Sequence, residues 1–169
     1  MRVREWMKRE VHAVKPRDTI LHAREILEEQ RINQLPVIVN GKVVGIITDR
    51  DLRDAFPSVF DAPGFHGEPR KPSRKPEQVP VEEVMTEKVI TVSPDEELVA
   101  ATQLMRRERV AALPVVDAER MVGILTRSDV LDAFVALAEG ESPSRPPAGE
   151  APERTAVKAA AKEKGRSRK

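Results

Sequence analysis

Apolar and polar residues follow two distinct spacings in the first 140 positions of the chain. Residues 35–39 and 43–47 are continuous apolar runs, typical of strands covered on both faces, and Asn40-Gly41 between them is a strong signal for a two-residue hairpin turn. Upstream of these runs, an apolar stripe with helical spacing consists of Ile20, Ala23, Ile26 and Leu27. The pattern therefore predicts a helix followed by a hairpin.

The same pattern returns 78 residues later, so the chain contains an internal repeat. Aligning residues 3–56 with residues 81–134 without a gap gives 19 identical pairs in 54 positions. The identities run from Val3 and Val81 at the start of the copies to Phe56 and Phe134 at their ends. The chain therefore carries two copies of one structural unit.

Each copy predicts the order strand, helix, strand, strand, helix. Short strands are expected at residues 11–14 and 89–92, and the final helices are expected to begin at Asp49 and Arg127. In the second copy, residues 93–96 (Ser-Pro-Asp-Glu) have the residue types of an N-cap and first helical turn, so the middle helix is expected to begin there. The predicted fold class is α/β (α+β), with two βαββα repeats.

Composition divides the chain into four segments. Residues 1–56 are the first repeat, residues 57–78 are a linker with five prolines, and residues 79–138 are the second repeat. Residues 139–169 contain almost no large apolar side chain, and from Glu141 onward they hold eight basic and four acidic residues. Because such a segment buries too little surface to offset the entropy of ordering, we expect a disordered basic tail rich in alanine and lysine.

Residue types exclude several kinds of chemistry. The chain has no cysteine, which excludes disulfides and thiolate sites. Its three histidines, His12, His22 and His66, lack metal-ligand spacing, so no metal site is predicted. No nucleophile or second titratable group accompanies the acidic residues of the motifs described below, so no catalytic residue and no enzyme activity are predicted.

Charge and hydropathy limit the partners. The net charge is +1 for the chain and +4 for residues 141–169, which leaves +1 − 4 = −3 for residues 1–140. With one tryptophan and no tyrosine as well, this argues against a nucleic-acid-binding body. No apolar run is long enough to span a membrane, and the start lacks a signal-peptide pattern. A cytoplasmic protein with no membrane partner is expected.

Both copies place the motif Gly-h-h-Thr-x-x-Asp, in which h is apolar, at the turn from the hairpin into the final helix. Thr48 with Asp51, and Thr126 with Asp129, have the spacing of a capping box that satisfies the first backbone N–H groups of a helix. The same groups could instead hold a ligand, because such N–H groups and a hydroxyl bind phosphate, and a carboxylate accepts from ribose hydroxyls. Local sequence favours the capping interpretation, and the ligand interpretation stays open.

Three motifs in the same order in both copies resemble the CBS domain family, named after cystathionine β-synthase, whose units occur in pairs as a Bateman module. The first two are Val-x-Glu-h-Met at residues 3–7 and 81–85, and a six-residue segment ending in Leu-Pro-Val at residues 32–37 and 110–115. The third is the Gly-h-h-Thr-x-x-Asp ending. The resemblance covers residues 1 to about 138 and implies two repeats packed through their sheets as a pseudo-two-fold pair.

A closer similarity is to the stand-alone CBS-pair proteins of the acetoin-utilisation type. It rests on residues 48–53 (Thr-Asp-Arg-Asp-Leu-Arg), residues 56–58 (Phe-Pro-Ser) and residues 128–134 (Ser-Asp-Val-Leu-Asp-Ala-Phe). The tail lacks the additional small-molecule-binding domain that some of these proteins carry. A role in acetoin metabolism would therefore be analogy alone.

The resemblance implies a non-catalytic regulatory module that binds AMP, ADP, ATP or S-adenosylmethionine in clefts between paired repeats, without an obligatory cofactor. By position, it implies that Asp51 and Asp129 bind the ribose hydroxyls. The residues implied for the phosphate are Thr48, Thr126, Arg50 and Arg127. The residues implied for the adenine pocket are His12, Ile32, Asn33, Gln34, Pro36, Ile90, Val110, Ala111, Ala112 and Pro114.

Differences between the copies predict two unequal sites. Arg50 could neutralise a phosphate in the first copy, whereas Ser128 occupies the equivalent position of the second, so affinity or ligand charge should differ. Residues 33–34 are bulkier than residues 111–112, which could narrow the first cleft. Residues 106–109 (Arg-Arg-Glu-Arg) are expected to form a solvated helix face, although the resemblance lets an arginine there reach a phosphate.

The resemblance also implies a homodimer that signals ligand occupancy to a regulated protein, which the sequence does not identify. Two rival functions stay open. One is a ligand-free interaction scaffold, in which Thr48 and Thr126 act only as caps. The other is a nucleic-acid-associated protein that uses the basic tail through salt-dependent phosphate contacts.

Overall fold

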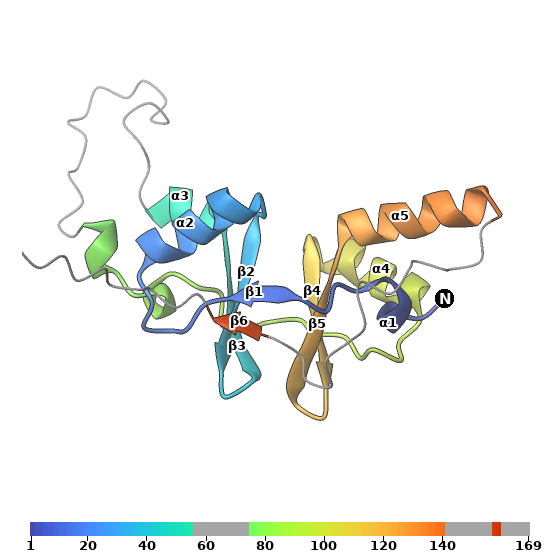
Figure 1. Cartoon of the computed structure of the whole chain (residues 1–169), viewed down its shortest axis with the longest axis horizontal. Coiled ribbons are helices and arrows are strands. Elements are labelled where there is room, and N and C mark those ends of the chain that lie inside the picture. The colour runs from blue at the N-terminus through green and yellow to red at the C-terminus, as the bar shows by residue number, and fades with distance from the viewer. Residues whose placement is uncertain (56–74, 141–156, 160–169) are drawn as a thin grey trace, which may run out of the picture.

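The computed structural model of the chain describes residues 1–55, 75–140 and 157–159. The first repeat forms, in chain order, α1 (Val3–Trp6), β1 (Val11–Ala13), α2 (Ile20–Gln30), β2 (Gln34–Val39), β3 (Lys42–Thr48) and α3 (Asp49–Ala55). The second forms the 3₁₀ helices η1 (Pro76–Gln78) and η2 (Val81–Glu83), then α4 (Leu98–Glu108), β4 (Ala112–Asp117), β5 (Arg120–Thr126) and α5 (Arg127–Ala138). The predicted α/β fold of two related repeats is confirmed (Figure 1).

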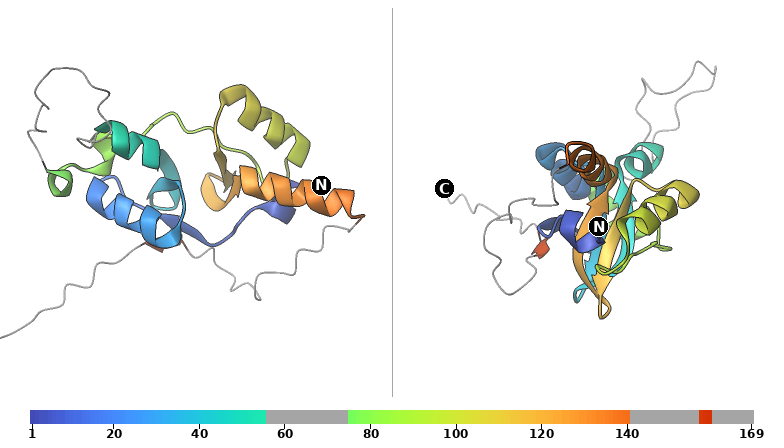
Figure 2. Two further views of the ribbon diagram at one scale, coloured as in Figure 1. Left: turned by 90° about the horizontal axis from the view of Figure 1, so that it is seen from above. Right: turned by 90° about the vertical axis from the view of Figure 1, so that its right-hand side faces the viewer.

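Two antiparallel hairpins form the centre of the molecule. β2 pairs with β3 and β4 pairs with β5, and the register shifts after Val37 in the first hairpin and after Val115 in the second. Asn40-Gly41 has the positive φ angles of a two-residue turn (52° and 83°), and Ala118-Glu119 repeats them (43° and 67°). Figure 1 shows the hairpins side by side, and the end-on view in Figure 2 places α1 and α4 on opposite sides of them.

The segment that precedes each repeat crosses to the other repeat. We call residues 1–10 the first arm and residues 79–88 the second arm. In the first arm, Lys8 pairs with Ile124 of β5 through two backbone hydrogen bonds of 2.9 Å. In the second arm, Thr86 pairs with Ile46 of β3 in the same way, at 2.9 and 3.0 Å. Figure 1 accordingly shows α1 beside α5, at the opposite end of the molecule from α2.

The crossing arms mean that each hydrophobic core contains side chains from both repeats. The core around Leu113 and Leu125 includes Val3 and Trp6 of the first arm. The core around Leu35 and Ile47 includes Val79 and Val81 of the second arm. A third cluster lies between the hairpins and consists of Val11, Ala13, Ile38, Ala112, Met121 and Ile124. Neither repeat therefore completes its core alone.

Two equivalent glycines allow the arms to approach the hairpins closely. A Cβ atom on Gly45 would overlap the sulfur of Met85 in the second arm. A Cβ atom on Gly123 would lie 2.7 Å from the carbonyl oxygen of Lys8 and 2.9 Å from the sulfur of Met7 in the first arm. The motifs Val-x-Glu-h-Met and Gly-h-h-Thr-x-x-Asp thus meet across the two repeats, methionine against glycine.

Two predictions for the second repeat are wrong. Residues 89–91 form no strand, and only Val92 makes a β-bridge, to Val115, because no neighbouring segment in the described part of the chain extends the pairing. The middle helix begins at Leu98 rather than within residues 93–96. The carbonyl groups of Pro94 and Glu96 instead accept hydrogen bonds from the backbone of the first arm, both of 3.0 Å.

The structure describes only small parts of the predicted linker and tail. Most of the predicted linker lies outside the described residues, which resume at Lys75 and form η1. The predicted tail also lies outside them apart from residues 139–140 and β6 (Val157–Ala159), a short strand that pairs in parallel with β1 and that the sequence did not indicate. The boundaries of the four segments stay a prediction.

Candidate functional site

The predicted threonine–aspartate pairs build the turns from β3 into α3 and from β5 into α5. The backbone N–H and the hydroxyl of Thr48 both donate to Asp51 Oδ2, at 2.8 and 2.7 Å, and the N–H of Asp51 donates to Thr48 Oγ1 at 3.2 Å. Thr126 and Asp129 repeat these bonds at 2.8, 2.6 and 3.4 Å. The capping interpretation is therefore confirmed at both turns.

Each cap engages one carboxylate oxygen of its aspartate, Oδ2. The surroundings of the other oxygen, Oδ1, differ between the repeats. No hydrogen bond or ion pair from the described residues reaches Asp51 Oδ1, and the Asp51 side chain is only partly buried. Asp129 is 1% exposed, and the ammonium of Lys8 lies 3.5 Å from its Oδ1. Asp51 thus keeps an acceptor for a ligand hydroxyl, whereas the equivalent acceptor of Asp129 faces a cation of the protein.

Asp51 opens onto a cleft of about 340 Å³, which we call the first cleft. This volume is within the range of small-molecule sites in proteins. The first cleft is lined from the first repeat by Gln34, Ile46, Thr48, Arg50 and Asp51, and from the second arm and second repeat by Thr86, Lys88, Val89, Ile90, Arg109, Val110, Ala111, Ala112 and Pro114. The cleft therefore exists only where the two repeats meet.

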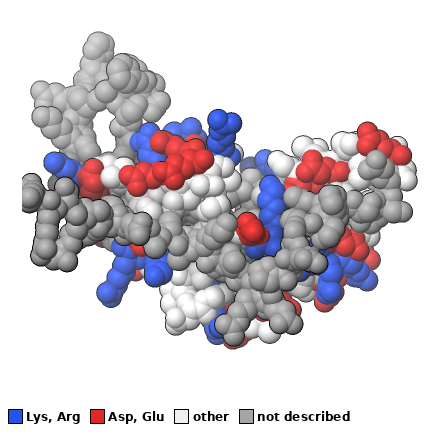
Figure 3. All heavy atoms as spheres, in the orientation of Figure 1, with Lys and Arg blue, Asp and Glu red and all other residues white. Residues whose placement is uncertain are grey.

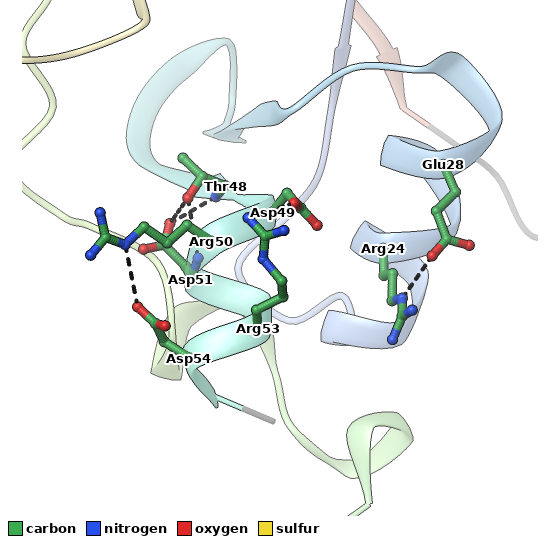
Figure 4. Close-up of polar contacts among 8 residues, drawn as sticks. All are labelled: Arg24, Glu28, Thr48, Asp49, Arg50, Asp51, Arg53 and Asp54. Carbon is green, nitrogen blue, oxygen red and sulfur yellow. Dashed lines mark hydrogen bonds and ion pairs between the residues drawn. The ribbon is translucent and has the colours of Figure 1, made fainter. Parts of the chain in front are cut away.

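Charged side chains make the first cleft electropositive. Arg50, Lys88 and Arg109 line it with a single carboxylate, that of Asp51, so the formal charge of the lining is +3 − 1 = +2. Figure 4 shows Arg50 beside Asp51 on α3, where its Nε lies 3.7 Å from Asp54 in an exposed ion pair. Such exposed pairs are weak, so Arg50 can turn to an anion in the cleft. The lining suits a ligand with negative charge.

One wall of the cleft is small and apolar. Ile90, Val110 and Pro114 contribute aliphatic surface, and Ala111 and Ala112 add short apolar side chains. Arg109 precedes this segment and ends α4 in the left-handed conformation, with φ at 57°. A cleft that combines this apolar wall with three cations suits a ligand that has both a flat heterocycle and an anion.

The first cleft unites nine of the residues predicted for a site. They are Gln34, Thr48, Arg50, Asp51, Ile90, Val110, Ala111, Ala112 and Pro114. The adenine-type segment of the second repeat therefore faces the threonine–aspartate pair of the first. Seven predicted residues do not line this cleft: His12, Ile32, Asn33, Pro36, Thr126, Arg127 and Asp129.

Those seven residues occupy several environments. His12 lies in β1, Pro36 is fully buried in β2, and the exposed Asn33 accepts a backbone hydrogen bond of 3.0 Å from Asp49. Arg127 is exposed at the start of α5. Of residues 33–34, Gln34 lines the first cleft and Asn33 does not, and the expected narrowing of this cleft stays a prediction.

Sequence reasoning missed four residues of the cleft wall: Ile46, Thr86, Lys88 and Val89. Thr86, Lys88 and Val89 belong to the second arm or follow it directly, and they reach the first cleft because that arm crosses to β3. These residues could have been found only from the pairing of Thr86 with Ile46, which brings Met85 onto Gly45. No pattern within either segment specifies that pairing. Arg109 belongs to residues 106–109, for which the sequence predicts a solvated helix face and the resemblance lets one of the arginines reach a phosphate; Arg109 is the arginine of this segment that lines the cleft.

The described residues, 1–55 with 75–140 and β6, contain no group of three or more histidine, cysteine, aspartate or glutamate side chains placed to hold a metal ion. Within the same ranges, no helix has both the length and the apolar character that crossing a bilayer requires.

Comparison with known proteins gives a consistent family signal. The family model of the CBS domain matches residues 3–58 and 81–136, which together make up more than half of the chain. The CBS domain-containing protein YhcV of Bacillus subtilis is 31% identical over 128 residues, a region that covers 76% of this chain and 81% of YhcV.

Solved structures agree with this signal. The CBS domain pair of protein MJ0100 in complex with 5′-methylthioadenosine and S-adenosyl-L-methionine has a TM-score of 0.66 at 28% identity, covering 81% of this chain and 98% of that one. CBSX2 in complex with AMP has a TM-score of 0.66 at 26% identity, with 81% and 98% covered. AcuB from Vibrio cholerae, assigned to acetoin utilization, has a TM-score of 0.67 at 28% identity, with 82% and 93% covered. The similarity to stand-alone pairs predicted from the motifs is confirmed.

Proposed function

The chain belongs to the CBS domain family, and from this premise we propose that it is a non-catalytic regulatory module that binds an adenine nucleotide in the first cleft and signals occupancy to a partner protein. The observation that carries the proposal is Asp51 Oδ1, which no described residue engages and which faces an electropositive cleft shared by both repeats. A ligand there contacts the hairpin of one repeat and the arm of the other, so its binding energy depends on how the repeats are placed.

Each part of the ligand has a matching group in the cleft. Ribose hydroxyls would donate to Asp51 Oδ1, a charge-assisted bond that is stronger than a neutral one. The phosphate would be neutralised by Arg50, Lys88 and Arg109, and Thr48 lies beside them. Adenine would lie along residues 110–112 and Ile90, where the wall is apolar.

Charge separates the candidate ligands AMP, ADP, ATP and S-adenosylmethionine. The related structures hold AMP in one case, and 5′-methylthioadenosine with S-adenosyl-L-methionine in the other. The sulfonium of S-adenosylmethionine is a cation and would meet the three cations of the first cleft, whereas the phosphates of a nucleotide would be attracted to them. We therefore expect AMP, ADP or ATP to bind more tightly than S-adenosylmethionine.

Titration calorimetry tests the proposal. AMP, ATP and S-adenosylmethionine are titrated into the wild type and into Asp51→Asn, which keeps the size of the side chain and removes its charge. The loss of hydrogen bonds to a charged acceptor should weaken AMP binding by about ten- to a hundredfold. Asp132→Asn is the matched control, because Asp132 is exposed on α5 at a distance from the cleft lining. Equal affinity of wild type and Asp51→Asn would refute the assignment of Asp51.

A homodimer forms part of the same proposal and is supported by α5. This helix exposes Leu131, Phe134, Val135 and Leu137 at 50–67% of their surface, an apolar face that nothing in the chain covers among the described residues. Faces of this kind mark protein contacts. Phe134→Asp should convert a dimer into a monomer in sedimentation velocity runs, while Asp132→Asn should leave it dimeric. A monomeric wild type at micromolar concentration would contradict the dimer.

The ligand-free scaffold is the second candidate, and the caps themselves favour it. Thr48 and Asp51 satisfy each other without a ligand, so their presence alone does not require one. The scaffold predicts no calorimetric signal with any of the three ligands, and it retains the apolar face of α5 as its contact surface.

For the nucleic-acid alternative, the basic tail lies outside the described residues apart from β6. Figure 3 shows both signs of charge on the face drawn, with acidic side chains gathered over α2, where Glu25, Glu28 and Glu29 are exposed. Deletion of residues 141–169 tests this alternative by retention on DNA at low salt.

A cytoplasmic location completes the proposal, and cell fractionation tests it.

A further inference from the structure

The 78-residue repeat gives each residue that lines the first cleft a counterpart in the other repeat, and we call the counterpart positions around Asp129 the second cleft. Two of the exchanges change the charge. Thr86 corresponds to Lys8, so a neutral side chain becomes a cation, and Lys88 corresponds to Glu10, so a cation becomes an anion. The two clefts thus differ in charge at two equivalent positions.

The backbone holds Lys8 and Thr86 at equivalent places. Lys8 exchanges two hydrogen bonds of 2.9 Å with Ile124, and Thr86 exchanges the same bonds with Ile46 at 2.9 and 3.0 Å. Each residue therefore lies beside the strand that leads into its threonine–aspartate cap. The lysine side chain is long enough to reach the carboxylate, and its Nζ lies 3.5 Å from Asp129 Oδ1. Thr86 lines the first cleft and donates no hydrogen bond to Asp51 Oδ1.

The carboxylate of Asp129 is buried, and the half-exposed ammonium of Lys8 lies beside it. The Asp129 side chain is 1% exposed and that of Lys8 is 47% exposed, and Asp129 Oδ1 has no hydrogen-bond partner in the described part of the chain, so the ammonium is the cation that faces this oxygen. Removing Lys8 would leave a buried carboxylate oxygen without its charged neighbour, which is unfavourable. A ribose hydroxyl is neutral and could not replace the ammonium in that role.

We infer that Lys8 closes the second cleft to adenosine-bearing ligands by occupying Asp129 Oδ1, the atom whose counterpart on Asp51 faces the first cleft. The chain then binds one such ligand and not two. The inference rests on the proposed function, since it assumes that the carboxylate of the motif is the ribose acceptor. The residue at the position of Lys8 and Thr86 decides which clefts are open.

Exchanging the two residues tests the inference. The probe is 5′-methylthioadenosine, whose lack of a phosphate removes the difference between Lys88 and Glu10 from the comparison. Calorimetry counts its sites in the wild type, in Lys8→Thr and in Thr86→Lys. We expect Lys8→Thr to bind one more molecule per chain than the wild type. We expect Thr86→Lys to lose the first site or to bind about ten- to a hundredfold more weakly, because the new ammonium takes Asp51 Oδ1.

The fluorescence of Trp6, the single tryptophan of the chain, shows whether the second cleft remains folded, because Trp6 is buried two residues from Lys8. Lys8→Thr could fail to fold because it leaves the charge of Asp129 uncompensated. In that case the affinity of Thr86→Lys for 5′-methylthioadenosine tests the inference, since this variant adds a cation next to the carboxylate of Asp51 and removes no ion pair. Two sites in the wild type, or unchanged site numbers in a folded Lys8→Thr, would overturn the inference. The proposed function fails separately, by the absence of any AMP binding that depends on Asp51.

Discussion

The two arms enter the molecule in the same way but are anchored unequally. Val3 and Val81 are each fully buried in the opposite repeat. The first arm adds Trp6, which is 5% exposed, where the second arm has the smaller and only partly buried Val84. The first arm also forms an ion pair from Arg4 to Asp95. The internal repeat therefore fixes where an arm docks, while single side chains decide how strongly it is held.

The largest expected effect on stability comes from removing Trp6, the side chain that anchors the first arm and has no equivalent of its size in the second. Trp6→Ala should lower the free energy of unfolding by about 3 kcal/mol, the low end for a buried tryptophan, because its indole N–H has no partner in the described structure. Val84→Ala, at the equivalent position, should cost about 1 kcal/mol. Urea unfolding followed by circular dichroism measures both. Equal costs would show that the arms are anchored alike.

The glycines at which the arms touch the hairpins give the next effect. Gly123→Ala forces Cβ against the carbonyl oxygen of Lys8, a backbone atom held by its bridge to Ile124, and should cost about 2–3 kcal/mol. Gly45→Ala meets the flexible side chain of Met85, which can move, and should cost about 1 kcal/mol. Melting temperatures of the two variants check the order. The reverse order would mean that Met85 is held more rigidly than the first arm.

The threonine caps separate stability from ligand binding. Thr48→Ala and Thr126→Ala each remove one N-cap and should each cost about 1 kcal/mol of stability. If the first cleft alone binds a nucleotide, only Thr48→Ala should also weaken AMP binding. Calorimetry and thermal melts on the same samples measure both quantities. Weaker AMP binding in Thr126→Ala would place a ligand in the second cleft.

The smallest effect is a pH dependence at the hairpin tips. Lys42 Nζ donates to Glu119 Oε2 at 2.6 Å, and this hydrogen bond and the lysine charge lower the pKa of Glu119 below its usual value. Because the folded pKa is the lower one, the pair stabilises the protein above the unfolded pKa, and its contribution is lost as the pH falls through the folded pKa. Melting temperatures of wild type and Lys42→Met should differ slightly at pH 7 and converge in acid. A constant difference would exclude this pair as the cause.

Local features of the fold could be predicted because their physical cause lies within a few residues. Asn40-Gly41 specifies its turn by the φ angles that it tolerates, and the apolar run 35–39 forms β2 because both its faces are covered. Thr48 and Asp51 cap their helix because three residues separate them. Each of these signals is complete within one copy of the repeat, and each appears in the structure as the pattern indicates.

The crossing of the arms between the repeats could not be predicted, because the two copies are too similar. Val3 and Val81 are the same residue in the same motif, so nothing in either sequence says that each packs on the other repeat. The positions of Thr86 and Lys88 in the first cleft follow from this exchange. The start of α4 at Leu98 also depends on it, since the carbonyl groups of Pro94 and Glu96 accept hydrogen bonds from the first arm instead of from a helical turn.

The exchange of arms has a consequence for how the protein can be divided. A polypeptide cut between Ala55 and Lys75 would yield two fragments, each carrying the valine that fills the interior of the other. Neither fragment would be a self-sufficient folding unit, yet together they would reconstitute the native molecule as a tight heterodimer. Gene fission at this point is thus compatible with the architecture, and loss of either half is not.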